Sequence, residues 1–290
     1  MISKRLTLGS AQFGGNYGIA NTNGKVKVSE VYNIFNYAYE KGIDTIETAI
    51  AYGNSEQVIG QYLGNHSNEK WSVITKIKGL SEHLHDQINQ SIDRIGKIPD
   101  AVLAHSASDY LVPTFCKALH QLKKTQKINQ VGVSIYSMDD ISLIEESSFK
   151  PDIIQLPLNI LDTRLYRYGF LKKLHDQGVE IHARSVFLQG LFYLPERELL
   201  TRFKDAMPYM NKLRSIASEA ELTLPELSLL WLVSLKEISK VVIGFDNTDQ
   251  LKMHLKTVKK NPDSTIFKKA LSVHYENDII LNPSLWPSIS

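Results

Sequence analysis

Residues 42–56 read GIDTIETAIAYGNSE, and this stretch decides the fold that we predict. It begins as a run of β-branched residues, continues into a polar glycine-asparagine turn, and leads into a helix that starts at Ser55. An acid, Glu47, and a tyrosine, Tyr52, lie where the predicted strand ends. Because the carboxyl ends of strands carry the chemistry of parallel α/β proteins, these two residues are candidates for a functional site.

The same order of apolar run, polar break and amphipathic segment recurs along the chain of 290 residues. The apolar runs predict strands at Leu6–Ser10, Asp44–Thr48, Ser72–Lys76, Ala101–His105, Gln130–Ser134, Asp152–Leu158, Glu180–Val186 and Lys240–Phe245. The amphipathic segments predict helices at Val31–Lys41 (with Ser29 as its N-cap), Ser55–Leu63, Ser81–Ile95, Pro113–Thr125, Met138–Glu146, Arg164–Gln177 and Gln250–Val258, and a longer helical region at Thr201–Leu235 that is broken at Pro208 and before Pro225.

Eight strands, most of them followed by a helix, predict a (β/α)8 TIM barrel. No linker of low complexity divides the chain, so we expect a single domain over residues 1–290, with 262–290 as a C-terminal tail that packs on the barrel. The competing α/β arrangement is a doubly wound sheet, which normally has a GxGxxG turn after its first strand, and this sequence has none.

Composition excludes several classes of function. Hydrophobic residues make up 43% of the chain and charged residues 22%, which is typical of a globular protein. The net charge of +2 favours neither nucleic acid nor a membrane surface as a partner, and no apolar run is long enough to span a bilayer. We expect a monomer, with a homodimer left open, because no heptad pattern is evident.

Cysteine and histidine usage argues against disulfides and metal. Cys116 is the only cysteine, and the N-terminal segment has no apolar signal region, so we expect a cytoplasmic protein. His83 and His85 are two residues apart on a predicted helix and do not share a face, and no HExxH motif occurs. We therefore predict no metal site.

Polar residues at the ends of predicted strands form a candidate catalytic set. In a barrel, Glu47, Tyr52, Lys76 and His105 would converge on one mouth. A nearby ammonium lowers the pKa of a phenol, a carboxylate keeps that ammonium in place, and a histidine can orient a carbonyl oxygen. The set is suited to giving a proton to a carbonyl group. No side chain supplies hydride, so reduction would require a nicotinamide cofactor.

At this point the sequence resembles the aldo-keto reductase superfamily over almost its whole length. The resemblance rests on the order and spacing of LTLGSAQFGGNYGIAN (6–21), GIDTIETAIAYGNSE (42–56), VITKIKG (73–79), AVLAHS (101–106), VGVSIYS (131–137), IIQLPLNILD (153–162), ARSVFLQGLF (183–192) and VVIGFDNTDQL (241–251). It implies a (β/α)8 barrel that binds NADP(H) or NAD(H) across its mouth and reduces an aldehyde or ketone. The opening segment is similar to bacterial members associated with carbohydrate metabolism, which suggests a sugar-derived carbonyl.

The resemblance also implies roles for single residues. Tyr52 is expected to be the general acid, Lys76 to lower its pKa, and His105 to orient the carbonyl, with Glu47 in the position of the family's aspartate. The implied cofactor-binding residues are Gly9 and Ser10 near the nicotinamide, Ser134 and Gln155 on its carboxamide, Arg184 against its ring, Ser185, Leu188 and Gln189 along the pyrophosphate, and Gly244, Asp246, Asn247 and Gln250 at the adenosine end.

Several positions depart from the family pattern and keep other interpretations open. Glu47 replaces aspartate, Ile135 replaces an asparagine, and Arg184 stands where many members have an aromatic residue. Asp246 would repel a 2′-phosphate and accept a hydrogen bond from a ribose hydroxyl, which favours NADH. The alternative function is a cofactor-binding regulatory or scaffold protein with weak or no catalysis. A third possible function is a reversible redox step within the reaction of an epimerase or isomerase.

Overall fold

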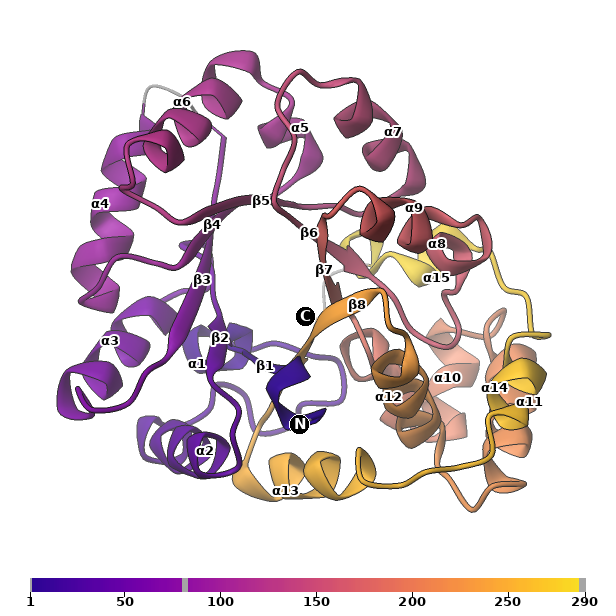
Figure 1. The fold of residues 1–290 in the computed structure, drawn as a ribbon. Coiled ribbons are helices and arrows are strands. Elements are labelled where there is room, and N and C mark those ends of the chain that lie inside the picture. Colours follow the sequence, from indigo (N-terminus) through magenta and orange to yellow (C-terminus); the bar gives the residue numbers. More distant parts are fainter. Residues whose placement is uncertain (1, 80–82, 287–290) are drawn as a thin grey trace.

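A closed barrel of parallel strands is the central feature of the computed structural model, which describes residues 2–79 and 83–286 (Figure 1). Each strand pairs with the next one in sequence, and β8 pairs with β1 to close the ring, with Gly244 opposite Gly9. The strands are β1 (Leu6–Gly9), β2 (Thr45–Glu47), β3 (Ser72–Ile77), β4 (Ala101–Ala104), β5 (Gln130–Ser134), β6 (Ile153–Pro157), β7 (Glu180–Arg184) and β8 (Ile238–Gly244). The prediction of a single-domain (β/α)8 barrel is therefore confirmed.

Helices surround the barrel, so that each strand is covered on its outer face (Figure 1). The longer ones are α2 (Val28–Glu40), α3 (Ser55–Asn65), α4 (Leu84–Ile95), α6 (Pro113–Lys124), α7 (Met138–Glu146), α11 (Met207–Ser218), α12 (Leu224–Ser234) and α13 (Thr248–Thr257). The shorter ones are η1 (Ile2–Arg5), α1 (Ala11–Gly14), α5 (Ala107–Tyr110), α8 (Arg164–Arg167), α9 (Phe170–Asp176), η3 (Leu188–Tyr193), α10 (Glu196–Arg202), α14 (Thr265–Ala270), α15 (Asp278–Leu281) and η4 (Pro283–Leu285).

Two predicted helix boundaries are wrong, and each has a local cause. Lys27, not Ser29, occupies the N-cap of α2, and Ser29 lies inside its first turn. The helix predicted at Arg164–Gln177 is divided into α8 and α9, because Gly169 between them adopts a left-handed conformation with φ of 77°. The third predicted helix was expected to begin at Ser81, which lies outside the described residues.

Each strand has helices on its outer face and the side chains of the barrel interior on its inner face, so both of its faces are buried. The strands β1, β4 and β6 are buried at every position, which is why their sequences read as continuous apolar runs instead of alternating ones. Helix α2 instead buries one stripe, made by Val31, Ile34, Phe35 and Ala38, and leaves the other face in solvent. Both patterns are visible in the sequence, so they carry most of the information on the fold.

The amino ends of the strands are held by aspartates that each bond to the neighbouring strand. Asp100, just before β4, accepts a hydrogen bond from the Val73 backbone N–H at 2.8 Å and another from Lys97 Nζ at 2.9 Å. Asp152, just before β6, makes the same pair of contacts with Val131 and Lys123, at 2.9 and 2.6 Å. These carboxylates satisfy backbone donors where the sheet ends. We call this end of the barrel the floor.

Residues of the C-terminal segment contact the helices that follow β6 and β7. Trp286 meets Phe203 with ring centroids 4.8 Å apart and donates a hydrogen bond to the Ile280 carbonyl oxygen at 3.0 Å. Arg164 of α8 forms an ion pair with Asp278 of α15. Residues 287–290 of the predicted tail lie outside the described part of the chain.

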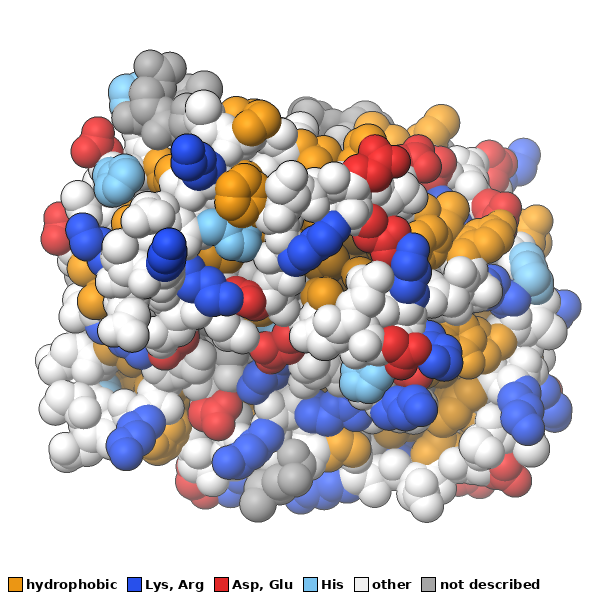
Figure 2. All heavy atoms as spheres, turned by 45° about the horizontal axis from the view of Figure 1, so that its top comes forward, with side chains coloured by type: hydrophobic (Ala, Val, Ile, Leu, Met, Phe, Trp, Pro, Cys, Tyr) orange, Lys and Arg blue, Asp and Glu red, His pale blue; other side chains and the backbone are white. Residues whose placement is uncertain are grey.

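The surface carries charges of both signs. On the face shown in Figure 2, Lys and Arg side chains are interspersed with Asp and Glu, and apolar side chains lie between them. Within residues 2–79 and 83–286, no helix is both long enough and apolar enough to cross a membrane.

Candidate active site

Glu47 and Lys76 form a buried ion pair at the carboxyl ends of β2 and β3. The Lys76 ammonium contacts Glu47 Oε1 and donates a hydrogen bond to the Thr48 carbonyl oxygen at 3.1 Å. From β6, Gln155 Nε2 donates to the same Glu47 oxygen at 3.3 Å. Only 2% of the Lys76 side chain and 4% of the Glu47 side chain are exposed. The glutamate side chain thus reaches the lysine, and each charge depends on the other for compensation.

Tyr52 and His105 lie against this pair. Lys76 Nζ is 4.7 Å from the centroid of the Tyr52 ring, close enough for attraction between the cation and the ring face. The His105 ring meets Tyr52 edge to face, with centroids 6.2 Å apart and ring planes at 85°. The fold thus brings together the four residues predicted as catalytic: Glu47, Tyr52, Lys76 and His105.

Two glycines allow the loop that carries Tyr52 to approach the loop after β1. A Cβ atom at Gly14 would lie 1.6 Å from the Tyr52 carbonyl oxygen, and one at Gly53 would lie 2.3 Å from the Gly14 carbonyl oxygen. Gly53 also has a φ of 55°, which side chains rarely permit. A larger residue at either position would separate the two loops and displace Tyr52.

Burial determines the protonation states in this cluster. It raises the pKa of the Tyr52 phenol, which the positive charge of Arg184 opposes only in part. Burial, followed by the nearby charges of Lys76, Lys78 and Arg184, lowers the pKa of His105 to about 3. Burial, followed by Arg184, also lowers the pKa of the Lys76 ammonium, whereas contact with Glu47 favours its charged form. At neutral pH, Tyr52 therefore keeps its proton and His105 is uncharged.

The predicted effect of Lys76 on Tyr52 requires a correction. The sequence predicts a lowered phenol pKa, but the net shift is upward because burial of the hydroxyl outweighs the nearby positive charge. Lys76 lies over the face of the Tyr52 ring, and its hydrogen bond goes to the Thr48 carbonyl oxygen.

Arg184, at the end of β7, reaches across to the end of β5. Its Nη2 donates to the Ile135 carbonyl oxygen at 2.8 Å, its Nη1 donates to Ser185 Oγ at 3.1 Å, and its guanidinium carbon lies 4.3 Å from the centroid of the Tyr136 ring. The hydroxyl end of Tyr17 is close enough for Arg184 to lower its pKa, although burial raises it overall. No role for Tyr17 or Tyr136 can be predicted from the sequence, because only the fold shows that they share the mouth with Tyr52.

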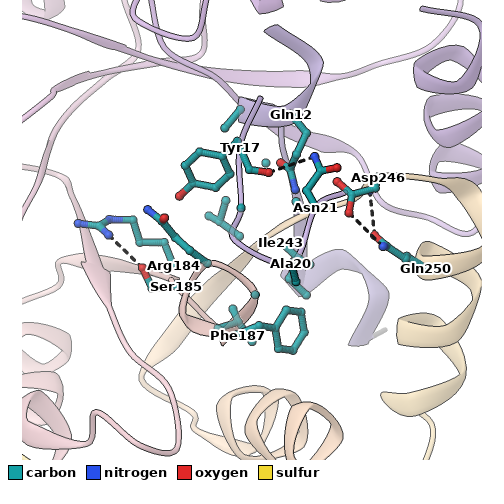
Figure 3. Close-up of a pocket in the computed structure, with 18 of the residues that line it drawn as sticks. Gln12, Tyr17, Ala20, Asn21, Arg184, Ser185, Phe187, Ile243, Asp246 and Gln250 are labelled. Atoms are coloured by element: carbon teal, nitrogen blue, oxygen red, sulfur yellow. Dashed lines mark hydrogen bonds between the residues drawn. The ribbon is translucent and has the colours of Figure 1, made fainter. Parts of the chain in front are cut away.

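A cavity of about 430 Å³ runs across the mouth from the Tyr52 region to the loop after β8. In Figure 3, Arg184 and Ser185 lie at one end and Asp246 and Gln250 at the other, with Tyr17, Ala20 and Asn21 between them. The predicted site residues that line the cavity are Gly9, Glu47, Tyr52, Arg184, Ser185, Gln189, Gly244, Asp246 and Gln250.

The remaining predicted residues do not line this cavity, and most of them have partners elsewhere. Leu188 is buried in the core, Ser10 Oγ accepts a hydrogen bond from Ser55 Oγ at 2.7 Å, and the Asn247 side chain caps α13 by accepting from the Gln250 N–H at 2.9 Å. Lys76, Ser134 and Gln155 are buried, and His105 is half-buried beside the Tyr52 ring.

The loops after β1 and β7 meet over the cavity. The Ile19 N–H donates to the Gln189 carbonyl oxygen at 2.9 Å, and Gly190 lies so close to Ala20 that a Cβ atom there would be 2.9 Å from the alanine methyl. Ser185, Leu188 and Gln189 all have positive φ, of 60°, 48° and 52°. The β7 loop is therefore held in a strained conformation, of the kind that accumulates at functional sites.

The far end of the cavity is formed by the loop after β8 and by α13. The Asp246 N–H donates to Gln250 Oε1 at 2.8 Å, and Gln250 Nε2 donates back to Asp246 Oδ2 at 3.1 Å. The other carboxylate oxygen, Oδ1, is buried and has no hydrogen-bond partner among the described residues. This oxygen is a free acceptor on a residue that lines the cavity.

An aromatic cluster adjoins this end and was not predicted. His254 stacks on Phe187 with ring centroids 4.9 Å apart and planes at 19°, and its Nε2 lies 3.5 Å from the Tyr193 hydroxyl. Burial lowers the pKa of His254 to about 4, so its ring is neutral at physiological pH. His254 lies on the buried face of α13 with Leu251 and Leu255, and this helical spacing is the sequence signal that could have predicted its burial.

Comparisons with known proteins give a consistent result. Residues 5–269 match the model of the Aldo/keto reductase family. The D-arabinose 1-dehydrogenase of Saccharomyces cerevisiae is 24% identical over 280 residues, which cover 84% of this chain and 82% of that protein.

Two solved structures are similar in fold. One is an aldo-keto reductase from Bacillus halodurans in its holo form, with a TM-score of 0.77, 20% identity, and coverage of 93% of this chain and 92% of that one. The other, from Pseudomonas aeruginosa and described as an aldo-keto reductase, has a TM-score of 0.65, 17% identity, and coverage of 88% and 89%. At sequence identities of 20% and 17%, the similarity to these two structures shows a shared barrel fold.

Proposed function

The chain belongs to the aldo/keto reductase family of oxidoreductases, and on that premise we propose that it reduces an aldehyde or ketone to an alcohol with NADH or NADPH. One observation carries this proposal: Tyr52 lines the cavity while its ring lies against Lys76 and faces His105. A phenol that keeps its proton, beside a buried ammonium and a neutral imidazole, is suited to protonating a carbonyl oxygen.

The proposed roles follow from the protonation states. Tyr52 holds the proton to be donated, since burial raises its pKa. His105 is neutral at working pH and can donate a hydrogen bond that orients the carbonyl oxygen, since burial lowers its pKa to about 3. Lys76, held by Glu47, provides positive charge next to the phenol as it loses its proton. A bound reduced nicotinamide supplies the hydride, which no side chain can provide.

The residues of the cavity are compatible with a dinucleotide. The cavity is elongated and joins the Tyr52 region to the Asp246 region. Two buried acceptor atoms, Gln155 Oε1 and Asp246 Oδ1, have no hydrogen-bond partner among the described residues, and Asp246 lines the far end of the cavity. Such orphaned polar atoms are expected where a ligand completes the hydrogen bonding. We propose that Gln155, Ser134 and Arg184 hold the nicotinamide end, Ser185 and Gln189 the pyrophosphate, and Asp246 and Gln250 the adenosine end.

NADH is the proposed preference. The unpartnered Asp246 Oδ1 can accept a hydrogen bond from a ribose hydroxyl, whereas its negative charge would repel a 2′-phosphate. Lys252 does not compensate for this charge, because its ammonium is engaged with Asp249 at 3.0 Å. Replacement of Asp246 by serine should therefore improve binding of NADPH relative to NADH.

The name of the yeast relative supports a sugar-derived carbonyl as substrate. That protein is named as a dehydrogenase acting at carbon 1 of D-arabinose, so a related site can accept a sugar and transfer hydride at its carbonyl carbon. With 24% identity over most of both chains, we propose this substrate class for the present protein as well.

Titration of the purified protein with NADH and with NADPH, followed by nicotinamide fluorescence, tests the proposal. We expect tight binding of at least one cofactor, tighter for NADH, and oxidation of the bound cofactor when aldehydes and aldoses are added. Binding without oxidation by any carbonyl compound would favour a regulatory or scaffold role on the same barrel. Failure to bind either cofactor would contradict the proposed mechanism.

A further inference from the structure

Tyr17 brings a second phenol to the end of the cavity where Tyr52 lies. We propose that Tyr17 is a specificity-determining residue whose hydroxyl binds a hydroxyl group on the carbon next to the carbonyl of the substrate. This inference rests on the proposed function, because it names the group that the same site would recognise in a sugar-derived carbonyl compound.

The loop after β1 carries Tyr17 and is fixed against the loop after β7. The Tyr17 carbonyl oxygen accepts a hydrogen bond from Asn21 Nδ2 at 3.2 Å, and Gly18 follows with a φ of 92°. The Ile19 N–H donates to the Gln189 carbonyl oxygen at 2.9 Å, which anchors the loop across the cavity. A side chain on a backbone that is already held loses less conformational entropy when it binds a ligand.

The hydroxyl of Tyr17 faces the space in front of the proposed proton donor. The residue as a whole is 41% exposed, but its hydroxyl lies deep enough in the mouth for burial to raise its pKa. Figure 3 shows the Tyr17 oxygen directed toward the Arg184 end of the cavity. Tyr17 is also close enough to Tyr52 to contribute to the raised pKa of that phenol. A substrate whose carbonyl oxygen meets Tyr52 therefore presents the substituents of its neighbouring carbon to Tyr17.

The chemistry of this phenol matches an alcohol. Because its pKa is raised, Tyr17 is neutral at physiological pH, and a neutral phenol can both donate and accept a hydrogen bond. The Gln189 side chain hydrogen-bonds to Tyr17 and lowers its pKa, which is the effect of an N–H donated to the phenol oxygen. The hydrogen of the phenol is not used in that contact and is available to an acceptor in the cavity. A hydroxyl oxygen of the substrate supplies such an acceptor, whereas an apolar substituent supplies none.

The other side chains of the β1 loop that line the cavity are less suited to this contact. The two alanines among them offer only methyl groups. Asn21 uses its amide within the loop, where Nδ2 donates to the Tyr17 carbonyl oxygen and Oδ1 accepts from a backbone N–H. Gln12 lies against the end of β8, so that a Cβ atom on Gly244 would be 2.3 Å from its Oε1. Tyr17 is therefore the residue of this loop that can present a hydroxyl to the substrate.

The test compares carbonyl compounds of similar shape that differ by one hydroxyl group. Lactaldehyde (2-hydroxypropanal) is paired with 2-methylpropanal, and 3-hydroxybutanal, with its hydroxyl one carbon further away, is paired with 3-methylbutanal. Steady-state kcat/KM at saturating cofactor is measured for the wild-type protein, Tyr17→Phe and Tyr209→Phe. Tyr209 provides the matched control, because it is 38% exposed, lies on the outer helix α11 and packs against Tyr275.

We expect the wild type to prefer lactaldehyde to 2-methylpropanal, and Tyr17→Phe to lower this ratio of kcat/KM by about 5- to 10-fold, the value of one hydrogen bond. Comparison of the ratio between proteins cancels differences in hydration of the aldehydes. The ratio for the 3-hydroxy pair should not change in Tyr17→Phe, and Tyr209→Phe should keep both ratios.

Three results would overturn the inference. The first is a wild type that does not prefer lactaldehyde. The second is a Tyr17→Phe protein with both members of each pair lowered together, because a contact with the cofactor or a purely structural role would leave the ratio constant. The third is an equal loss of preference in the 2-hydroxy and 3-hydroxy pairs, which would contradict the position assigned to the hydroxyl.

A binding experiment separates this inference from the proposed function. Isothermal titration uses lactamide and 2-methylpropanamide, unreactive analogues of the first pair, with the protein alone and saturated with oxidised cofactor. We expect lactamide to bind about fivefold more tightly than its analogue, and Tyr17→Phe to bring the two affinities to within about twofold. If no carbonyl compound is reduced, the proposed function fails, but a preference for lactamide that depends on Tyr17 still supports the hydroxyl site. Absence of lactamide binding, equal affinities in the wild type, or a preference that Tyr17→Phe retains would overturn it.

Discussion

The two ends of the barrel treat charged side chains in opposite ways. At the floor, Asp100 and Asp152 each combine a backbone partner with a lysine that reaches solvent: Val73 and Lys97 for Asp100, and Val131 and Lys123 for Asp152. At the mouth, Lys76 and Glu47 are paired almost without solvent, and Gln155 Oε1, His105 Nδ1 and Asp246 Oδ1 have no partner among the described residues. The floor contains such atoms too, among them His182 Nδ1 and Ser3 Oγ.

The difference shows which end is built for stability and which for chemistry. Charges that keep access to water contribute to stability at little desolvation cost, whereas buried pairs and unsatisfied acceptors are costly unless a ligand uses them. The barrel thus concentrates its costly electrostatics at the carboxyl ends of the strands, where TIM barrels carry their sites. If this division is correct, substitutions at the mouth should affect turnover, and substitutions at the floor should affect only folding.

Tyr52→Phe should produce the largest effect. Removal of the phenol hydroxyl removes the proposed proton donor, and kcat should fall by about 10²- to 10⁴-fold, the usual contribution of a general acid. The ring contacts with Lys76 and His105 are retained, so cofactor affinity should stay within about twofold. Steady-state kinetics and fluorescence titration of the same preparation measure both. Retention of turnover would show that another group gives the proton.

Disruption of the buried ion pair should give the largest loss of stability. Lys76→Met leaves Glu47 charged and buried without a countercharge, and unfolding in urea should show a loss of about 3–5 kcal/mol. The double variant Glu47→Leu, Lys76→Met should recover much of that loss, because it removes both charges. The exposed pair Lys172 and Asp176 is the control, and Lys172→Ala should leave the urea midpoint unchanged. Equal losses in the single and the double variant would contradict the account.

At the floor, Asp100→Ala should destabilise the protein without affecting chemistry. It leaves the Val73 N–H without its acceptor and Lys97 Nζ with only the Trp71 carbonyl oxygen, for a loss of about 1–3 kcal/mol in unfolding free energy. Because Asp100 lies before β4, at the opposite end from Tyr52, kcat should remain at the wild-type value. A fall in kcat at full folding would mean that the two ends of the barrel are not independent.

The smallest effect should appear as a pH dependence of stability at the floor. Hydrogen bonding to His182, assisted by Gln130, lowers the pKa of Glu180 from 4.5 to about 2. A lowered carboxyl pKa stabilises the folded state above pH 4.5, and this contribution is lost as the pH falls from 4.5 towards 2. Since 34% of the Glu180 side chain is exposed, we expect only about 1 kcal/mol. Urea unfolding of wild type and Glu180→Gln across this range should converge at low pH, and parallel curves would refute the assignment.

The sequence predicts the barrel and much of the proposed site because both depend on local patterns. Continuous apolar runs mark strands covered on both faces, and Glu47, Lys76 and His105 stand at or near their ends. Positions that depend on contacts between distant loops could not be predicted. Tyr17 and Tyr136 join the mouth only because the β1, β5 and β7 loops converge there.

The protonation behaviour of Tyr52 could not be predicted from the sequence either. Proximity of Lys76 to Tyr52 suggests a lowered phenol pKa, but the depth of burial, which no local pattern reveals, reverses the direction. Asn247 shows the same limit on a smaller scale: its side chain serves as the N-cap of α13, a role that competes with the predicted contact to the cofactor.

The most direct test of the account is transfer of isotope from the cofactor. The wild-type protein and Tyr52→Phe are each mixed with NADH or NADPH that carries deuterium at both hydrogen positions of the nicotinamide C4, together with the aldehyde that supports the fastest oxidation, and the alcohol is examined by mass spectrometry. The account predicts deuterium at the former carbonyl carbon for the wild type, and only a trace for Tyr52→Phe with its cofactor still bound. Equal labelling by both proteins would contradict the role of Tyr52, and bound cofactor with no labelled alcohol from the wild type would contradict the reductase itself.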